Sequence, residues 1–204
     1  MAQAASQNLH LKVSLHGIRP PIWRRLLVPS TCTLAQLHAA IQAAFGWKDC
    51  HLHTFTIYGE DYGPRDPEGE VDVKSERITL AKLGLRLKEK FRYVYDFGDD
   101  WVHDITVEKV YVPATPLSVP VCLGGKRAGP PEDCGGIWGY ENLLGALRDP
   151  GHPEHQQMKQ WLGGDWFPEV VDLDEVDARL DASFPPARAR STRPAPKSAT
   201  PPKG

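Results

Sequence analysis

The chain has 204 residues, of which 41% are hydrophobic and 25% are charged, as is typical of one globular domain with a real core. No apolar run approaches the roughly 20 residues that span a bilayer, and the N-terminus lacks the features of a secretory signal, so we expect a cytoplasmic protein without membrane contact. The net charge is −2, but residues 185–204 hold five cations and no acid, which leaves 19 basic and 26 acidic residues elsewhere. Because nucleic-acid binding needs a basic face, a nucleic-acid partner is possible but is not favoured by this acidic body.

The N-terminal part of the chain predicts two strands. Apolar and polar residues alternate over 9–15, which is the period of a half-buried strand. A Gly- and Pro-containing break follows at 17–21, and a second strand is expected over 22–28. Arg24 and Arg25 point to opposite faces of that strand, so only one of them can serve a given site.

A helix is predicted directly after these strands. Thr33 and Gln36 have the spacing of a capping box, in which each side chain satisfies a backbone N–H group at the helix start. Apolar residues follow at helical spacing as far as Phe45, and Gly46 is a typical helix stop. The apolar stripe of this helix is expected to pack on the sheet.

The middle of the chain predicts more strands. A third strand is expected over 51–58, a turn-rich stretch over 59–69 and a short helix over 80–83. Two alternating segments then flank residues 98–100, which predicts a hairpin with a three-residue loop. In that hairpin, Phe97 would pair with Trp101 and Tyr95 with His103.

A long ordered loop is predicted over 121–139, because this stretch contains six glycines and two prolines. Short helices are expected over 140–147, 155–162 and 173–180, the last with Asp172 and Glu175 spaced as a capping box. Together these elements predict an α+β fold: a mostly antiparallel sheet, an N-terminal helix packed on it, and short C-terminal helices. We expect one domain over 8–183, flanked by a disordered N-terminus, 1–7, and a disordered Pro-, Arg- and Lys-rich tail, 184–204.

Four stretches of the chain together resemble the plasmid pRi ORF-three-like family, which is also met as an insertion-element passenger with a TnpR-like label. The similarity extends roughly over residues 8–182. The stretches are PPIWRR at 20–25, HLHTF at 51–55, YVYDFGDDWVH at 93–103, and the Gly-rich segment from Cys122 to Tyr140 that contains PPEDCGG.

The resemblance implies an α+β domain of bacterial or archaeal origin that is associated with plasmids or mobile elements. It implies no activity and no catalytic residues, since the family has none assigned. The TnpR label suggests a resolvase, but a serine recombinase needs a nucleophilic serine among arginines and then a helix-turn-helix. Neither feature is present here, so we take the label as inherited.

Three histidines are candidate metal ligands. His51 and His53 are two residues apart, so both are expected on one face of their strand, and His103 lies on the hairpin close to several aspartates. Neutral imidazole and carboxylate can bind zinc or iron, so a divalent metal is the one cofactor that we consider. The alternative, which we favour, is that the histidines fill a polar-edged aromatic face.

The turn DFGDDW at 96–101 contributes candidate binding residues Tyr95, Asp96, Asp100 and Trp101. It resembles the kinase D-F-G motif, but the other kinase motifs are missing around it. A tight turn capped by aspartates is the interpretation that we favour, and a cation held by their carboxylates is the alternative.

The Gly-rich segment contributes Lys126, Arg127 and Cys134, which join Arg24 as binding candidates. Backbone N–H groups near Gly124 and Gly125, together with Lys126 and Arg127, could hold an anion, and Cys134 could be a nucleophile if a histidine reached it. We favour a loop packed over the sheet instead. The four cysteines form no CxxC pair and are expected to be reduced, so a bridge between Cys122 and Cys134 is not expected.

From the sequence we therefore expect a binding or accessory module without catalysis, whose partner is a protein or a small ligand. A metal-dependent hydrolase that uses the His/Asp cluster is the alternative, and a nucleic-acid-binding accessory protein is the third. The hydrolase requires His51, His53 and His103 to converge around an open position.

Overall fold

The computed structural model describes residues 7–64, 73–115, 117–164 and 166–185 of the chain. The disordered ends expected at 1–7 and 184–204 lie outside these residues, except for residues 7, 184 and 185. Among the described residues, no helix has the length and apolar character needed to cross a membrane.

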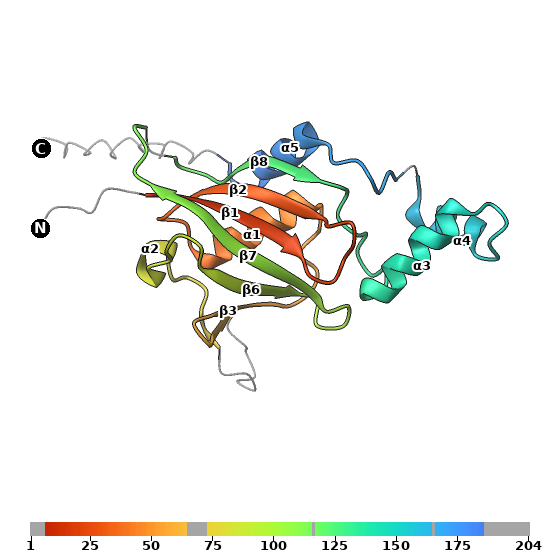
Figure 1. Ribbon diagram of the computed structural model, residues 1–204, viewed down its shortest axis with the longest axis horizontal. Helices are drawn as coiled ribbons and strands as arrows, with labels where there is room; N and C mark the ends of the chain where they lie inside the picture. Colours follow the sequence, from red (N-terminus) through yellow and green to blue (C-terminus); the bar gives the residue numbers. More distant parts are fainter. Residues whose placement is uncertain (1–6, 65–72, 116, 165, 186–204) are drawn as a thin grey trace, which may run out of the picture.

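The described residues form one eight-stranded sheet in the order β5-β4-β3-β6-β7-β1-β2-β8 (Figure 1). Every neighbouring pair is antiparallel except β4 and β5, which confirms the expected α+β class with a mostly antiparallel sheet. The strands are β1 (Asn8–Leu15), β2 (Trp23–Pro29), β3 (His53–Ile57), β4 (Glu60–Gly63), β5 (Lys74–Ser75), β6 (Lys90–Tyr95), β7 (Trp101–Tyr111) and β8 (Val121–Lys126).

Helix α1 (Leu34–Phe45) packs on one face of the sheet and closes the core (Figure 1). The predicted capping box is present: the Thr33 hydroxyl accepts from the Gln36 backbone N–H at 3.2 Å, and the Gln36 side chain accepts from Thr33 N at 2.9 Å. Gly46 ends the helix with φ of 86°, a left-handed conformation that favours glycine. The helix boundaries therefore follow from local sequence alone.

The hairpin between β6 and β7 forms, but the predicted pairing is wrong by two residues. Tyr95 pairs with Trp101 and Tyr93 with His103, so the loop covers five residues, 96–100, rather than three. The strand ends early because Asp96 adopts a φ of 57° and its carbonyl accepts from Asp100 N at 2.7 Å. The Asp96 carboxylate also accepts from the N–H groups of residues 98 and 99, so the aspartate organises the turn as expected.

Two parts of the sheet differ from the predicted loops. Residues 121–126, expected within a loop, form the edge strand β8 paired with β2, although the remaining residues up to 135 are a loop. Residues 60–63, expected within a turn-rich stretch, form β4 paired with β3. Both strands, β8 at the edge and β4 next to the edge strand β5, depend on their neighbours for pairing, and their own sequences carry weak strand signals.

Short helices complete the described chain: α2 (Leu80–Leu83), α3 (Gly136–Arg148), α4 (His155–Leu162) and α5 (Leu173–Ser183). The predicted helices at 80–83 and 155–162 have the predicted boundaries, whereas α3 begins four residues earlier than predicted. Figure 1 shows α3 and α4 beyond one end of the sheet, and α5 beside β8 and α1. The loop between β8 and α3 passes over the end of the sheet where β3 begins and β6 ends, and the polar residues described in the next section lie there.

Candidate metal centre

Polar side chains gather where β3 begins and β6 ends. The register places His53 opposite Tyr95, so His51, just before β3, lies near Asp96, just after β6. The loop over 127–135 adds Glu132 and Asp133 to this end of the sheet. Three segments that are distant in sequence thus supply one cluster.

This loop is fixed in place by specific contacts. The Trp47 indole N–H donates to the carbonyl of Pro130 at 2.9 Å, and Gly135 N donates to the Asp99 carboxylate at 3.1 Å. Gly129 has no room for a side chain, because a Cβ atom there would lie 2.1 Å from the carbonyl oxygen of Phe45. The expectation that the loop packs closely over the sheet agrees with these contacts.

The imidazole of His51 faces three carboxylates. Its Nε2 lies 3.0 Å from Asp133 Oδ1, 3.5 Å from Asp96 Oδ2 and 3.9 Å from Glu132 Oε2. That nitrogen is buried, and although Asp133 lies within ion-pair distance, no acceptor or donor among the described residues is oriented to form a hydrogen bond with it. Ligand atoms of His51, Asp96 and Asp133 all lie within 4.8 Å of one another, and Cys50 forms a similar set with His51 and Glu132. His51 belongs to both sets, and we call His51, Asp96, Glu132 and Asp133 the candidate metal centre, shortened below to the metal centre.

Two of the three carboxylates of the metal centre, those of Asp96 and Glu132, are held in place by neutral donors. Asp96 Oδ1 accepts from two turn N–H groups, and Glu132 Oε1 accepts from Lys48 N at 2.7 Å and from the Tyr95 hydroxyl at 3.1 Å. Among the described residues, no lysine or arginine side chain forms an ion pair with Asp96, Glu132 or Asp133. Three carboxylates therefore converge on His51 without a lysine or arginine ion pair among the described residues, an arrangement that would suit a bound divalent cation.

Tyr95 serves the metal centre as a hydrogen-bond donor. Burial, together with the negative charge of Glu132, raises the pKa of its phenol well above the usual range. The hydroxyl therefore keeps its proton, donates to Glu132 and accepts from Cys50 N at 3.1 Å. It orients a carboxylate and does not act as an anionic ligand.

A second cluster lies between α1 and the sheet. The rings of His38 and His53 stack with their centroids 3.5 Å apart and their planes within 7°. His38 bonds to the Tyr93 hydroxyl at 2.7 Å and to Asp49 at 2.8 Å, and His53 bonds to Glu76 at 2.8 Å. Burial and the neighbouring His53 lower the pKa of His38 to about 4, so the imidazole is neutral at pH 7. Both ring nitrogens of His38 already have partners, so we assign this cluster to the packing of α1.

The structure does not bring the three predicted histidine ligands to one point. His51 belongs to the metal centre and His53 to the stacked pair, because β3 begins only at His53 and the two-residue alternation does not extend back to His51. His103 is completely buried with its ring edge-on to the stacked rings of Phe45 and Trp47, and burial lowers its pKa to about 3. The convergence that the hydrolase expectation required around these three residues is absent.

The other candidates are dispersed. Trp101 is buried in the core, while Asp100 and Lys126 are exposed. Arg127 is 1% exposed and pairs with Glu169, so it cannot reach an external partner.

The cysteine candidate shows little sign of reactivity. Cys134 is a free, half-buried thiol, and burial raises its pKa to about 12, which opposes a nucleophilic role. Cys122 is also free, so no bridge joins them, as expected.

Sequence reasoning missed several members of these clusters. Glu132 and Asp133 were part of the noted segment but were not singled out, and only the folded loop shows that they approach His51. His38 and Gln42 had a recognisable signal, because two polar residues four positions apart interrupt the buried stripe of α1.

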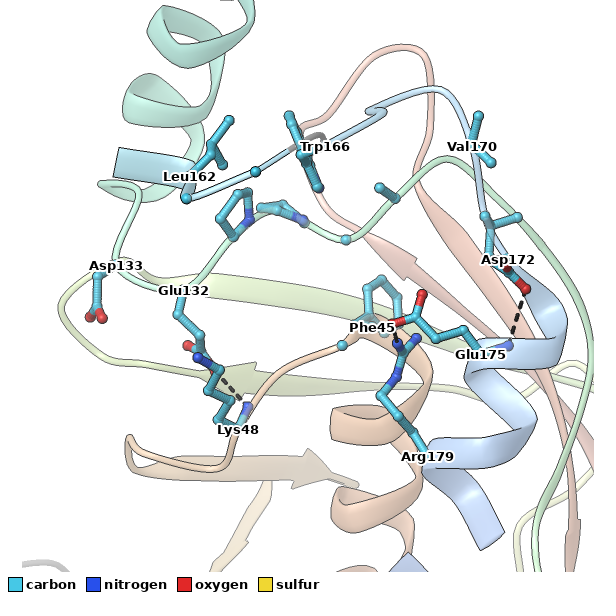
Figure 2. Close-up of a pocket in the computed structure, with 18 of the residues that line it drawn as sticks. Phe45, Lys48, Glu132, Asp133, Leu162, Trp166, Val170, Asp172, Glu175 and Arg179 are labelled. Atoms are coloured by element: carbon cyan, nitrogen blue, oxygen red, sulfur yellow. Dashed lines mark hydrogen bonds and ion pairs between the residues drawn. The ribbon is translucent and has the colours of Figure 1, made fainter. Parts of the chain in front are cut away.

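A pocket of about 560 Å³ adjoins the metal centre, and Figure 2 shows its residues. Glu132 and Asp133 lie at one side of it, and Arg24 and Arg179 also line it. The walls include the aromatic side chains of Phe45, Trp161 and Trp166. Volumes of 300–1,000 Å³ are typical of small-molecule sites.

Comparisons with known proteins agree with this fold and identify related chains. The family model described as plasmid pRiA4b ORF-3-like protein matches residues 7–175. An uncharacterized protein, y4hQ, of Sinorhizobium fredii is 35% identical over 176 residues, which cover 85% of this chain and 90% of that protein. The crystal structure of MM3350, a protein of unknown function from Methanosarcina mazei Go1, superposes with a TM-score of 0.76 at 37% identity, over 84% of this chain and 98% of that one.

Proposed function

The chain belongs to the plasmid pRiA4b ORF-3-like family, and we propose that it is a binding module whose ligand at the metal centre is a divalent metal ion. The observation that carries the proposal is the buried Nε2 of His51, which lacks a hydrogen-bond partner among the described residues and faces three carboxylates. A metal ion would accept the nitrogen lone pair and offset the charge of the carboxylates.

The donor set indicates which metals fit. One imidazole and several carboxylates suit Mn²⁺, Fe²⁺, Co²⁺ or Zn²⁺ better than Mg²⁺, which prefers oxygen ligands alone. The nearby Cys50 thiol would favour Zn²⁺ if it joined the set, because thiolate is a soft ligand. We therefore expect Zn²⁺ and Mn²⁺ to bind more tightly than Mg²⁺.

The test is calorimetric titration of chelator-treated protein with Zn²⁺, Mn²⁺ and Mg²⁺. We expect one ion per chain and a higher melting temperature when the ion is present, because it binds only the folded state. His51→Gln should weaken binding at least tenfold, whereas His16→Gln is the control, since His16 pairs with Asp104 away from the metal centre. Equal affinity of both variants and the parent, or no binding by the parent, would refute the proposal.

A metal-dependent hydrolase that uses the metal centre, and not the three histidines first expected, is a second proposed function, favoured by the position of the pocket. Glu132 and Asp133 belong to the metal centre and also line the pocket, so a substrate there would lie beside the ion. The Zn²⁺- or Mn²⁺-loaded protein should then hydrolyse p-nitrophenyl esters or phosphates, and His51→Gln should not. If the loaded protein binds metal without turnover, the function is binding alone.

An accessory role in plasmids is supported by the family's name alone, and its extension to insertion elements rests on the resemblance given above. This part of the proposal predicts that genes of family members lie beside mobile-element genes more often than random genes do. A survey of gene neighbourhoods that finds no such excess would remove it.

A further inference from the structure

Arg24 is a buried cation without a carboxylate partner among the described residues. Its side chain is on the inner face of β2 and only 2% of the residue is exposed. Arg127, the other deeply buried arginine, differs, because Glu169 accepts hydrogen bonds from both its Nε and Nη2. An unpaired buried charge is costly, so the environment of Arg24 needs an explanation.

Backbone carbonyls accept hydrogen bonds from only some of the N–H groups of the Arg24 guanidinium. Its Nε donates to the carbonyl of Ala44 at 2.8 Å, near the negative end of α1, and Nη1 donates to the carbonyl of Trp23 at 2.9 Å. Nη2 has no hydrogen-bond acceptor among the described residues, and this atom is partly accessible to solvent. If Arg24 served only to bind α1 to the sheet, Nη2 would have no protein acceptor, so this N–H group is available to a ligand.

The surrounding backbone makes room for the guanidinium. A Cβ atom at Gly125 would lie 2.7 Å from Cδ of Arg24, so glycine on β8 allows the side chain to reach the pocket. The guanidinium carbon also lies 5.0 Å from the centroid of the Phe45 ring, a cation–π contact. Arg179 lies at the same end of α1, where its Nε donates to the carbonyl of Ala43 at 2.7 Å.

The charges around the pocket limit what can bind there. Besides Arg24, Arg179 and Lys48, the lining includes four acids: Glu132, Asp133, Asp172 and Glu175. Figure 2 shows Glu175 reaching Arg179, an ion pair with an N–O distance of 2.6 Å. A doubly charged phosphate would meet repulsion from these acids, whereas a singly charged carboxylate would meet less and needs fewer donors.

We propose that this pocket binds a small organic acid, with its carboxylate at Nη2 of Arg24 and its apolar part against Phe45, Trp161 and Trp166. This goes beyond the proposed function and does not depend on it, because Arg24 is not part of the metal centre. Aromatic walls provide contact area, and one buried arginine fixes the orientation of the ligand.

The experiment is an NMR titration of chelator-treated protein with benzoate, acetate and inorganic phosphate, in which the indole N–H signals of Trp161 and Trp166 are followed. We expect saturable shifts with benzoate, weaker ones with acetate and none with phosphate. Arg24→Met should reduce the benzoate affinity at least tenfold. Arg25→Gln is the matched control, because Arg25 points to the other face of β2 and pairs with Glu108.

Arg24→Met removes a buried contact and can fail to fold, so a second variant is needed. Gly164 lines the pocket and a Cβ atom there would have no neighbour within 4 Å among the residues that the structure describes, so Gly164→Phe should fold and obstruct the pocket. Loss of benzoate binding in Gly164→Phe, with unchanged metal binding, supports the proposal. No saturation in the parent, binding of phosphate in preference to benzoate, or full affinity in Gly164→Phe overturns it.

Discussion

Replacing His103 with leucine should make the protein less sensitive to acid. His103 is completely buried, its Nδ1 donates to the carbonyl of Trp101 at 2.9 Å, and its Nε2 has no hydrogen-bond partner among the described residues. A charged imidazole there would be poorly solvated, and burial therefore lowers the pKa to about 3 from an ordinary value of 6.5.

The direction in which His103 changes stability with pH follows from its pKa values in the folded protein and in the unfolded chain. Between pH 3 and pH 6.5 the unfolded chain binds a proton that the folded protein excludes, so stability is present above pH 6.5 and is lost as the pH falls. At pH 5 the loss from this one group is about 2 kcal/mol, since each pH unit below 6.5 costs about 1.36 kcal/mol. His38, with a pKa lowered to about 4, adds a separate loss in the same direction.

The assay is urea unfolding of the parent and His103→Leu at pH 7, 6 and 5. Leucine costs the bond to Trp101 at every pH, so the informative quantity is the change in unfolding free energy between pH 7 and pH 5. That change should be about 2 kcal/mol smaller in His103→Leu than in the parent. Equal losses in His103→Leu and the parent would show that His103 does not titrate as its burial requires.

Three further predictions concern the loop, the first helix and the thiols. Gly129→Ala should lower the melting temperature by about 5 °C or more, because the added Cβ would collide with the carbonyl of Phe45. Gly145→Ala is the control and should leave the melting temperature unchanged, because a Cβ atom there would have no neighbour within 4 Å among the described residues. Equal melting temperatures of the two variants would contradict the prediction. Thr33→Ala should cost about 1 kcal/mol in urea unfolding through loss of the capping box, and a change near zero would count against it. At pH 8 a thiol reagent should modify the exposed Cys50 first, since burial raises the pKa of each of the other three thiols. Rapid labelling that persists in Cys50→Ser would refute the assignment of Cys50 as the most reactive thiol.

The elements predicted most accurately from the sequence are those fixed by local interactions. The capping box at Thr33 and the glycine stop at Gly46 set both ends of α1, and alternation alone located β1. The hairpin register failed because a three-residue loop was inferred from Gly98, whereas the conformation of Asp96 ends the strand earlier. Strand β8 was missed because its pairing with β2, not its own composition, makes it a strand.

The metal centre was predictable only in part. His51 and Asp96 were singled out as polar residues near aromatic strands, but separately, one among the histidines and the other in the turn. Their meeting with Glu132 and Asp133 depends on how the loop folds back over the sheet, and sequence spacing contains no such information. His103 was grouped with the other histidines because residue type does not show burial.

The assembly of the metal centre from three distant segments has a consequence for how the protein would respond to proteases. Asp96 and His51 are brought together by pairing within the sheet, but Glu132 and Asp133 arrive only when the loop over 127–135 docks. A cation bound by His51, Asp96 and Asp133 would join the sheet to this loop and would stabilise the docked loop more than the sheet beneath it. Limited proteolysis should therefore cut this loop more slowly when Zn²⁺ or Mn²⁺ is present, while cleavage elsewhere proceeds at the same rate.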